Sequence, residues 1–370
     1  MDEYDVLIVG AGVVGTAIGY GLAKRGRRVA MLDDSSYPFR ASLGNQGMVW
    51  RQPKGYNHRP YANLTASAVE SWAAFADELR DEVGIDCAYQ RTGGLSIASG
   101  PEELAGLTRA MRALQSHFTS GGCEFEIYDR SKLTTLYPSI GDEVPGAIYT
   151  PYDGICNPLA LLKALHHAFK ARGGDYVPAS RVNRIEALAG GGFKVFVEHG
   201  ERAYRAAKVV LAAGLGTLKL AQALGASVPI KPNRGQILVT ERLRDVNLLP
   251  SNILRPNQSG SLLIGASSDD VGYDTSLELV ASANIANRAL RIFPWLANVR
   301  VVRMWSALRI MTPDGKPIYQ ELPGARGVFV ATCHSGITLA PVHAHAVAEA
   351  IDRDTFGGEL SPFSMERFDV

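Results

Sequence analysis

The chain has 370 residues, which at roughly 150 residues a domain predicts two or three domains. Lys and Arg number 38 and Asp and Glu number 37, so the net charge of +1 gives no support to a nucleic-acid-binding or anionic-membrane-binding function. With 46% hydrophobic and 20% charged residues, the composition excludes a disordered chain. The 38 glycines make up about a tenth of the 370 residues, whereas the average share is about 7%. The positions of the glycines are therefore informative.

The first residues predict a soluble, cytoplasmic protein. The chain opens with Met1-Asp2-Glu3-Tyr4-Asp5, whereas a secretory signal opens with basic residues. The uncharged run 6–23 contains five glycines and is followed by basic residues, so a strand, a turn and a helix explain it better than a transmembrane segment. We therefore expect no transmembrane segment, and association with a membrane only through partner subunits.

The cysteines predict no metal centre. They are isolated in the sequence and form no CxxC or CxC pair, which zinc and iron–sulfur sites usually use. Isolated thiols in a chain of this length are typical of a reducing compartment. We expect all of them to be small buried side chains: Cys87, Cys123, Cys156 and Cys333.

A βαβ unit with a glycine-rich turn begins the chain. The aliphatic run 5–9 predicts a buried strand, residues 13–24 a helix and residues 28–32 a second strand. The turn between the first strand and the helix reads GxGxxG from Gly10 to Gly15, which lets a pyrophosphate approach the helix N-terminus. Asp33 ends the second strand and is placed to accept hydrogen bonds from a ribose, a task that Asp34 could share. The alternative, a solvated loop acid, is weaker in this context.

Later segments predict the rest of a doubly wound α/β domain. We expect a helix over 157–172, with Leu159, Leu162, Leu165 and Phe169 along one side, and a second helix over 338–352. Strands are expected over 176–182, 208–214 and 327–332, and an antiparallel pair over 193–197 and 202–206.

Two stretches of different character interrupt this pattern. Residues 91–151 and 231–303 mix amphipathic helices with alternating strands, such as 235–239 and 261–265. We interpret them as a substrate-binding domain inserted into a discontinuous dinucleotide-binding domain made of residues 1–90, 152–230 and 304–370.

Four motifs in order resemble the FAD-dependent D-amino-acid oxidase superfamily, which includes glycine oxidase, sarcosine oxidase and amino-acid dehydrogenases. They are the N-terminal fingerprint, the strand 209–214, the block 305–317 (WSALRIMTPDGKP) and the loop 333–341 (CHSGITLAP). Residues 44–50 (GNQGMVW), Lys54-Gly55 and the 333 loop are similar to the flavin subunits of opine oxidases and hydrogen cyanide synthase. The resemblance implies a Rossmann-like FAD-binding domain with an interleaved α+β substrate domain, and other redox subunits as partners.

The same resemblance implies the site residues. Arg309 would anchor a substrate carboxylate, although composition alone favours a surface arginine, and His334 is a catalytic candidate that could equally fix its loop. The implied FAD contacts are Gly10, Gly12, Val13, Val14, Gly15, Asp33, Asp34, Ser42, Gly44, Asn45, Gln46, Gly47, Met48, Val182, Ala213, Gly214, Gly336, Ile337, Thr338 and Leu339. Sarcosine oxidases attach flavin through a cysteine near the position of Ala307, so we expect noncovalent FAD here.

The expected activity is oxidation of the C–N bond of an amino acid or secondary amine of the glycine, sarcosine, proline, D-amino acid or opine class. Hydride transfer to flavin N5 gives an imine, which water hydrolyses. The alternatives are a nicotinamide-dependent dehydrogenase and a non-catalytic flavin subunit that relays electrons. A basic cluster at Arg51, Lys54 and His58 could hold a second acidic group or face a partner, with a solvated surface as the default interpretation.

Overall fold

The computed structural model describes residues 3–34, 40–119, 121–198, 202–244 and 247–368. Its N-terminal part is the predicted βαβ unit: β1 (Glu3–Val9), α1 (Val13–Lys24) and β2 (Val29–Leu32). β1 pairs in parallel with β2 on one side and with β11 (Ala203–Leu211) on the other. The turn between β1 and α1 therefore lies at the carboxyl edge of a parallel sheet, where doubly wound folds bind their ligands.

The large sheet follows the order β16-β17-β11-β1-β2-β8, and β10 and β9 extend it from β11. Its remaining strands are β8 (Asp175–Val177), β9 (Val182–Ala187), β10 (Phe193–Val197), β16 (Ile318–Glu321) and β17 (Val328–Thr332). Two sequence predictions are corrected. The segments expected at 202–206 and 208–214 form one strand, β11, whose first half pairs with β10 and whose second half pairs with β17. The strand expected at 176–182 ends at Val177, and Val182 begins β9.

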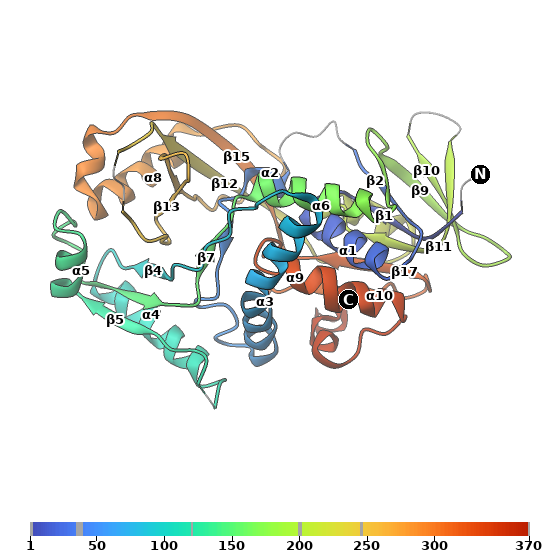
Figure 1. The fold of residues 1–370 in the computed structure, drawn as a ribbon, viewed down its shortest axis with the longest axis horizontal. Coiled ribbons are helices and arrows are strands. Elements are labelled where there is room, and N and C mark those ends of the chain that lie inside the picture. The colour runs from blue at the N-terminus through green and yellow to red at the C-terminus, as the bar shows by residue number, and fades with distance from the viewer. Residues whose placement is uncertain (1–2, 35–39, 120, 199–201, 245–246, 369–370) are drawn as a thin grey trace.

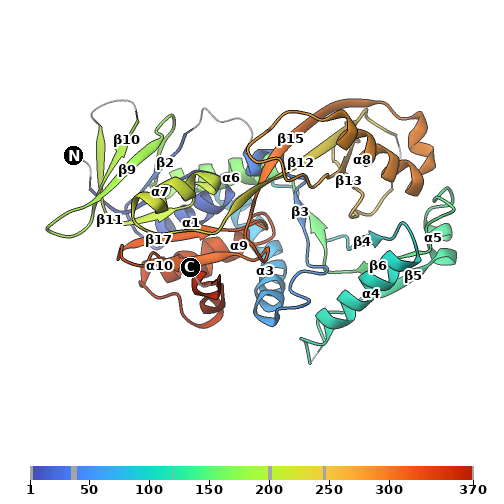
Figure 2. The same ribbon diagram turned by 180° about the vertical axis from the view of Figure 1, so that it is seen from behind.

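Helices cover both faces of this sheet (Figures 1 and 2). Val6 and Ile8 of β1 pack on the side of α1, while Leu7 and Val9 pack in the opposite core with β10, β11 and α7, so the strand is buried on both faces. The helices of these layers are α3 (Arg59–Val83), α6 (Pro158–Ala171), α7 (Thr217–Ala223), α9 (Ala340–Val342), a π-helical turn (His343–Val347) and α10 (Ala348–Asp352). In α6 the predicted apolar face is partly wrong: Leu159 is exposed, and Leu161 is buried instead.

The other half of the molecule holds three smaller sheets (Figures 1 and 2). The four-stranded sheet has the order β13-β14-β12-β15, the three-stranded sheet β4-β6-β5, and β3 pairs with β7. The strands are β3 (Met48–Val49), β4 (Gly94–Ile97), β5 (Glu126–Asp129), β6 (Gly146–Thr150), β7 (Gly154–Ile155), β12 (Lys231–Thr240), β13 (Leu254–Pro256), β14 (Leu262–Gly265) and β15 (Val301–Met311). The helices are α2 (Ala41–Gly44), α4 (Pro101–Gln115), α5 (Arg130–Leu136) and α8 (Leu279–Ile292).

A separate apolar core joins the three-stranded and four-stranded sheets. Leu95 and Ile97 of β4 lie in one buried cluster with Leu238 of β12 and Ile285 of α8. The predicted domain boundary between residues 303 and 304 falls inside β15, which stays in the four-stranded sheet up to Met311. The two-domain division therefore remains a proposal at that boundary. No helix in the described part of the chain has the length and apolar character that crossing a membrane requires.

Candidate active site

A cavity of about 690 Å³ opens at the carboxyl ends of β1, β2 and β11. The N-terminus of α1 at Gly12 has no side-chain cap and no acidic residue in its first turn, which suits an anionic group. Gly10 has φ = +105°, and a Cβ there would lie 2.5 Å from the carbonyl oxygen of Ala212. A Cβ on Gly15 would lie 2.0 Å from the oxygen of Gly10. The turn thus requires glycine at both positions, and its shape and its place at the N-terminus of α1 fit a pyrophosphate.

The two acids after β2 lie on this cavity. Asp33 accepts a hydrogen bond from the N–H of Ala11 (2.7 Å) and pairs with Arg40 (2.6 Å), so its carboxylate also holds the glycine-rich turn. Asp34 pairs with Arg181 (2.6 Å). Binding of a ribose by Asp33 remains a prediction that this position allows.

The predicted FAD contacts divide into three groups. Those on the large cavity are Gly10, Gly12, Val14, Asp33, Asp34, Ser42, Val182, Ala213 and Gly214. Those on a second, smaller cavity are Gly44, Asn45, Gln46, Gly47, Met48, Ile337 and Thr338. Those that line neither of these two cavities are Val13, Gly15, Gly336 and Leu339. Gly15 packs closely against Gly10, and Leu339 is buried in the core. The N–H of Val13 donates to Ser42 Oγ (3.0 Å).

The second cavity, of about 340 Å³, adjoins the first, because Ala41, Leu308 and Ile310 line both. It also holds Arg309 and His334, so the structure brings the two predicted catalytic residues to one place. Among the residues that the structure describes, its lining includes no Asp or Glu. We refer to the large cavity as the cofactor cavity and to the smaller one as the substrate cavity, names that follow the roles proposed for them below.

Arg309 lies on β15 with its guanidinium over β12. A Cβ on Gly235 would lie 2.5 Å from Arg309 Nη2, so the absence of a side chain there makes room for the guanidinium. Arg309 donates to Asn233 Oδ1 (2.8 Å), the Arg234 carbonyl (3.3 Å) and the Ser267 carbonyl (2.8 Å). A guanidinium has five N–H groups, so at least two remain for a ligand in the cavity. Two such donors suit a carboxylate.

Lys54 is a second cation on the substrate cavity. Its Nζ donates to Thr338 Oγ1 (3.0 Å), which also accepts from the N–H of Trp50 (3.2 Å). Burial lowers the pKa of Lys54 to about 8, because desolvation outweighs the attraction of Asp153. Thr338, predicted only as a flavin contact, thus connects the 333 loop to the segment that carries Lys54.

The backbone before Lys54 is held by a buried carboxyl group. Asp153 accepts from the N–H of Arg51 (2.6 Å) and from Gln52 Nε2 (2.7 Å). Burial raises the pKa of Asp153 to about 7, and these hydrogen bonds and the charge of Lys54 oppose that rise.

His334 lines the substrate cavity, where the residue is exposed although many protein atoms surround it. Burial, together with the neighbouring cations Lys54 and Arg309, lowers the pKa of His334 to about 4. The imidazole is therefore neutral near pH 7 and can exchange hydrogen bonds with a ligand without adding charge.

The default interpretation of the basic cluster as a solvated surface is wrong. Arg51 is only 3% exposed and stacks between the rings of Phe118 and Tyr152. His58 caps α3 by accepting from the N–H of Tyr61. Of the three, only Lys54 lines the substrate cavity, a position that fits the alternative in which this cluster holds a second acidic group.

The cysteines are buried and free, as predicted: Cys87, Cys123, Cys156 and Cys333. Within residues 3–34, 40–119, 121–198, 202–244 and 247–368, no group of three or more His, Cys, Asp or Glu is arranged to hold a metal ion.

The geometry fits a dinucleotide beside a carboxylate-binding cavity, and comparison with known proteins identifies which dinucleotide. The family described as FAD dependent oxidoreductase (DAO) matches residues 5–350. The chain belongs to this family. It is an oxidoreductase whose cofactor is FAD, which confirms the predicted cofactor and sets aside the nicotinamide alternative.

Relatives cover the chain over nearly its whole length. An opine oxidase subunit of Agrobacterium tumefaciens is 38% identical over 369 residues, covering 100% of this chain and 98% of that protein. The HcnC subunit of hydrogen cyanide synthase of Pseudomonas aeruginosa is 25% identical, covering 99% of this chain and 96% of that protein. The crystal structure of glycine oxidase from Geobacillus kaustophilus superposes with a TM-score of 0.90 at 29% identity, covering 99% of each chain. These relatives confirm the predicted superfamily and fold class.

Proposed function

We propose that this enzyme oxidises the C–N bond of an amine that carries carboxylate groups, and that its preferred substrates are secondary amines of the opine class. The carrying observation is the substrate cavity itself, whose lining includes both Arg309 and Lys54 and, among the described residues, no Asp or Glu. Two cations without a carboxylate suit an anion with two negative groups.

The resemblance of the whole chain to the opine oxidase subunit of Agrobacterium tumefaciens supports this substrate class over glycine or sarcosine. Opines are amino acids whose nitrogen bears a second carboxylate-containing group. In the proposed complex, Arg309 holds the carboxylate next to the carbon that is oxidised, and Lys54 holds the other.

When bound, FAD supplies the two-electron acceptor for this chemistry. The Cα–H leaves as a hydride, the nitrogen lone pair forms the C=N bond, and the remaining N–H proton passes to solvent. Water then hydrolyses the imine to a carbonyl compound and an amine. The chain's own contribution is orientation by Arg309 and Lys54, with a neutral His334 that adds no competing charge.

Partner subunits are a second part of the proposal. The opine oxidase relative and HcnC are both subunits of larger enzymes. We infer that this chain also works with other redox subunits, which would accept its electrons.

The experiment is an anaerobic screen of flavin absorbance on purified holoenzyme. We expect opines to bleach the flavin at lower concentration than glycine, sarcosine, proline or D-amino acids. Bleaching by glycine at equal or lower concentration would reject the opine preference. A flavin that no amine bleaches would reject catalysis and favour the electron-relay alternative.

A further inference from the structure

The segment that connects β14 to α8, residues 266–278, borders every cavity described above and one more; we call it the strap. Ala266 lines the substrate cavity, and Tyr273 lines the cofactor cavity. Ala266–Asp269 also line a third cavity of about 280 Å³, which shares Asn252, Gly265 and Ala266 with the substrate cavity. The position of the strap therefore affects both the cofactor and the substrate sides of the site.

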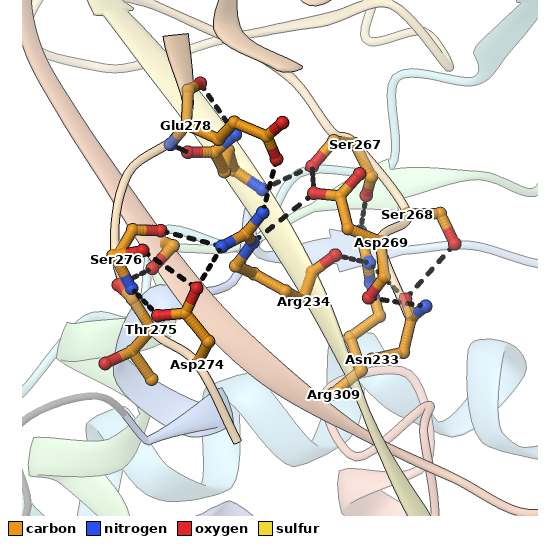
Figure 3. A network of polar contacts seen from close by, with 12 residues as sticks. Asn233, Arg234, Ser267, Ser268, Asp269, Asp274, Thr275, Ser276, Glu278 and Arg309 are labelled. Atoms are coloured by element: carbon orange, nitrogen blue, oxygen red, sulfur yellow. Dashed lines mark hydrogen bonds and ion pairs between the residues drawn. The ribbon is translucent and has the colours of Figure 1, made fainter. Parts of the chain in front are cut away.

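Apolar packing contributes little to holding the strap, because Val271, Tyr273 and Leu277 are exposed. Polar contacts from β12 and β15 hold it instead, including those of Gln236 and Ser306, and the buried cation among these groups is Arg234 of β12 (Figure 3).

The guanidinium of Arg234 pairs with three strap carboxylates. These pairs are Asp269 (3.5 Å), Asp274 (3.0 Å) and Glu278 (2.7 Å). Arg234 also donates to the carbonyl of Ser276 (3.1 Å). Without this cation the carboxylates would repel one another, so Arg234 helps to hold the strap together with the contacts of Gln236 and Ser306.

The same network reaches Arg309 through the Asn233 side chain and by two backbone routes (Figure 3). The first is direct, because the Arg234 carbonyl accepts from Arg309 Nη1 (3.3 Å). The second runs through the strap, where the Ser267 carbonyl accepts from Arg309 Nη2 (2.8 Å). Paired backbone hydrogen bonds between Arg234 and Asp269, each 2.9 Å, connect the two routes.

We propose that Arg234 is a positioning residue that fixes the guanidinium of Arg309 for a substrate carboxylate by holding the strap. This inference rests on the proposed role of Arg309 as the carboxylate anchor. A long arginine side chain has many rotamers, and acceptors fixed on the strap and on β12 remove most of that freedom before the ligand arrives. Arg234 itself has no place on the substrate cavity, so its effect passes through Arg309.

The test is titration of the oxidised holoenzyme with acetate, followed by the flavin absorption spectrum. We expect Arg234→Met to weaken acetate binding about tenfold, as the loss of a well-placed charged hydrogen bond would. Arg234→Lys should recover part of that loss, because it restores the positive charge. In an Arg309→Ala background, Arg234→Met should change the acetate Kd by less than about twofold, since coupled residues are not additive.

Milder variants keep the proposal testable if Arg234→Met does not fold. Asp274→Asn and Glu278→Gln each remove one half-exposed strap carboxylate, and each should weaken acetate binding about two- to threefold, again only when Arg309 is present. The matched control is Asp142→Asn, which breaks an exposed pair with Arg130 outside the site and should leave the Kd unchanged.

Equal losses with and without Arg309 would overturn the positioning role. Wild-type holoenzyme that binds no acetate would overturn it together with the anchor role of Arg309. Acetate binding that depends on both arginines, in a protein whose flavin no amine bleaches, would support the positioning role and contradict only the proposed oxidation.

Discussion

Lys54 and Arg309 place two positive charges on one small cavity, and each depends on contacts from distant segments. Thr338, which binds the Lys54 ammonium, lies 284 residues further along the chain. Burial makes the Lys54 charge costly in the free enzyme, and a bound carboxylate would offset that cost. The cavity is therefore prepared for an anion.

Lys54 should give the enzyme a pH dependence that concerns substrate binding. Its pKa of about 8 means that the side chain is charged below pH 8 and neutral above it. We expect the KM for an opine to rise as the pH rises through about 8, and Lys54→Met to raise the KM and remove this step. Steady-state kinetics from roughly pH 6 to 10, which spans this pKa, measure both effects.

The substrate amine also titrates, but it does so equally with the wild-type enzyme and with Lys54→Met. The difference between their KM–pH profiles therefore isolates the titration of Lys54. Lys132→Met, which removes an exposed lysine paired with Glu126, should behave as wild type. A pH step of the same size in Lys54→Met would contradict the assigned role.

Arg309→Ala should raise the KM for carboxylate-bearing amines while FAD stays bound. The loss of a charged hydrogen bond costs about 1.5–3 kcal/mol, which corresponds to a KM increase of about ten- to hundredfold. The measurement pairs steady-state kinetics with the flavin-to-protein absorbance ratio. Arg91→Ala, which breaks an exposed ion pair with Glu70, is the matched control. An unchanged KM would exclude Arg309 as the anchor.

At this scale the sequence predicted the glycine-rich turn and its acids from spacing alone, because those residues are close together in the chain. Arg309 and His334 came only from the family resemblance. The burial of Arg51 and Lys54 was not predictable, since it depends on partners such as Asp153 and Thr338 that are distant in the chain.

At the scale of elements, α2 and β15 form the junction of the two cavities. Trp305 Nε1 donates to the Gly44 carbonyl (3.0 Å), and a Cβ on Gly44 would lie 2.4 Å from the Cβ of Ala307. Because Ala41 and Leu308 line both cavities, this close approach of α2 to β15 lies at the boundary between them.

Gly44→Ala should therefore separate α2 from β15 and weaken FAD binding. Overpacking of this kind costs about 1–3 kcal/mol, which we expect as a lower melting temperature and a raised Kd for FAD. Gly106→Ala in α4 is a control that should raise the melting temperature. The new Cβ would contact few atoms, and the higher helix propensity of alanine would stabilise the helix by up to ~1 kcal/mol. Equal melting temperatures for the two variants would contradict the close contact.

Element predictions succeeded where periodicity is strong and local, as in α1 and β17. They failed where tertiary pairing decides the boundary. β11 is continuous because β10 pairs with its first half, and Leu159 is exposed because α6 presents Leu161 to the core instead.

At the scale of the whole molecule, the cofactor cavity is bordered by both halves of the fold. Its lining includes Gly10 and Asp33 near the large sheet as well as Leu308 and Tyr273 from the four-stranded sheet and the strap. FAD in this cavity would thus contact both the large sheet and the four-stranded sheet.

Removing FAD should lower the melting temperature of the protein. A ligand present at about a hundredfold excess over its Kd stabilises the folded state by about 2.7 kcal/mol. We expect the apoprotein to melt several degrees below the holoenzyme in differential scanning calorimetry, and added FAD to restore the difference. Identical melting temperatures would contradict stabilisation of the folded protein by bound FAD.

The central claim is that the substrate cavity selects an amine with two carboxylates. Iminodiacetate and sarcosine test it most directly, because both are secondary amines and they differ by one carboxylate. Under anaerobic conditions, we expect iminodiacetate to reduce half of the flavin at a concentration at least about tenfold below that needed with sarcosine, and Lys54→Met to remove this preference. Equal concentrations in the wild-type enzyme would contradict the account.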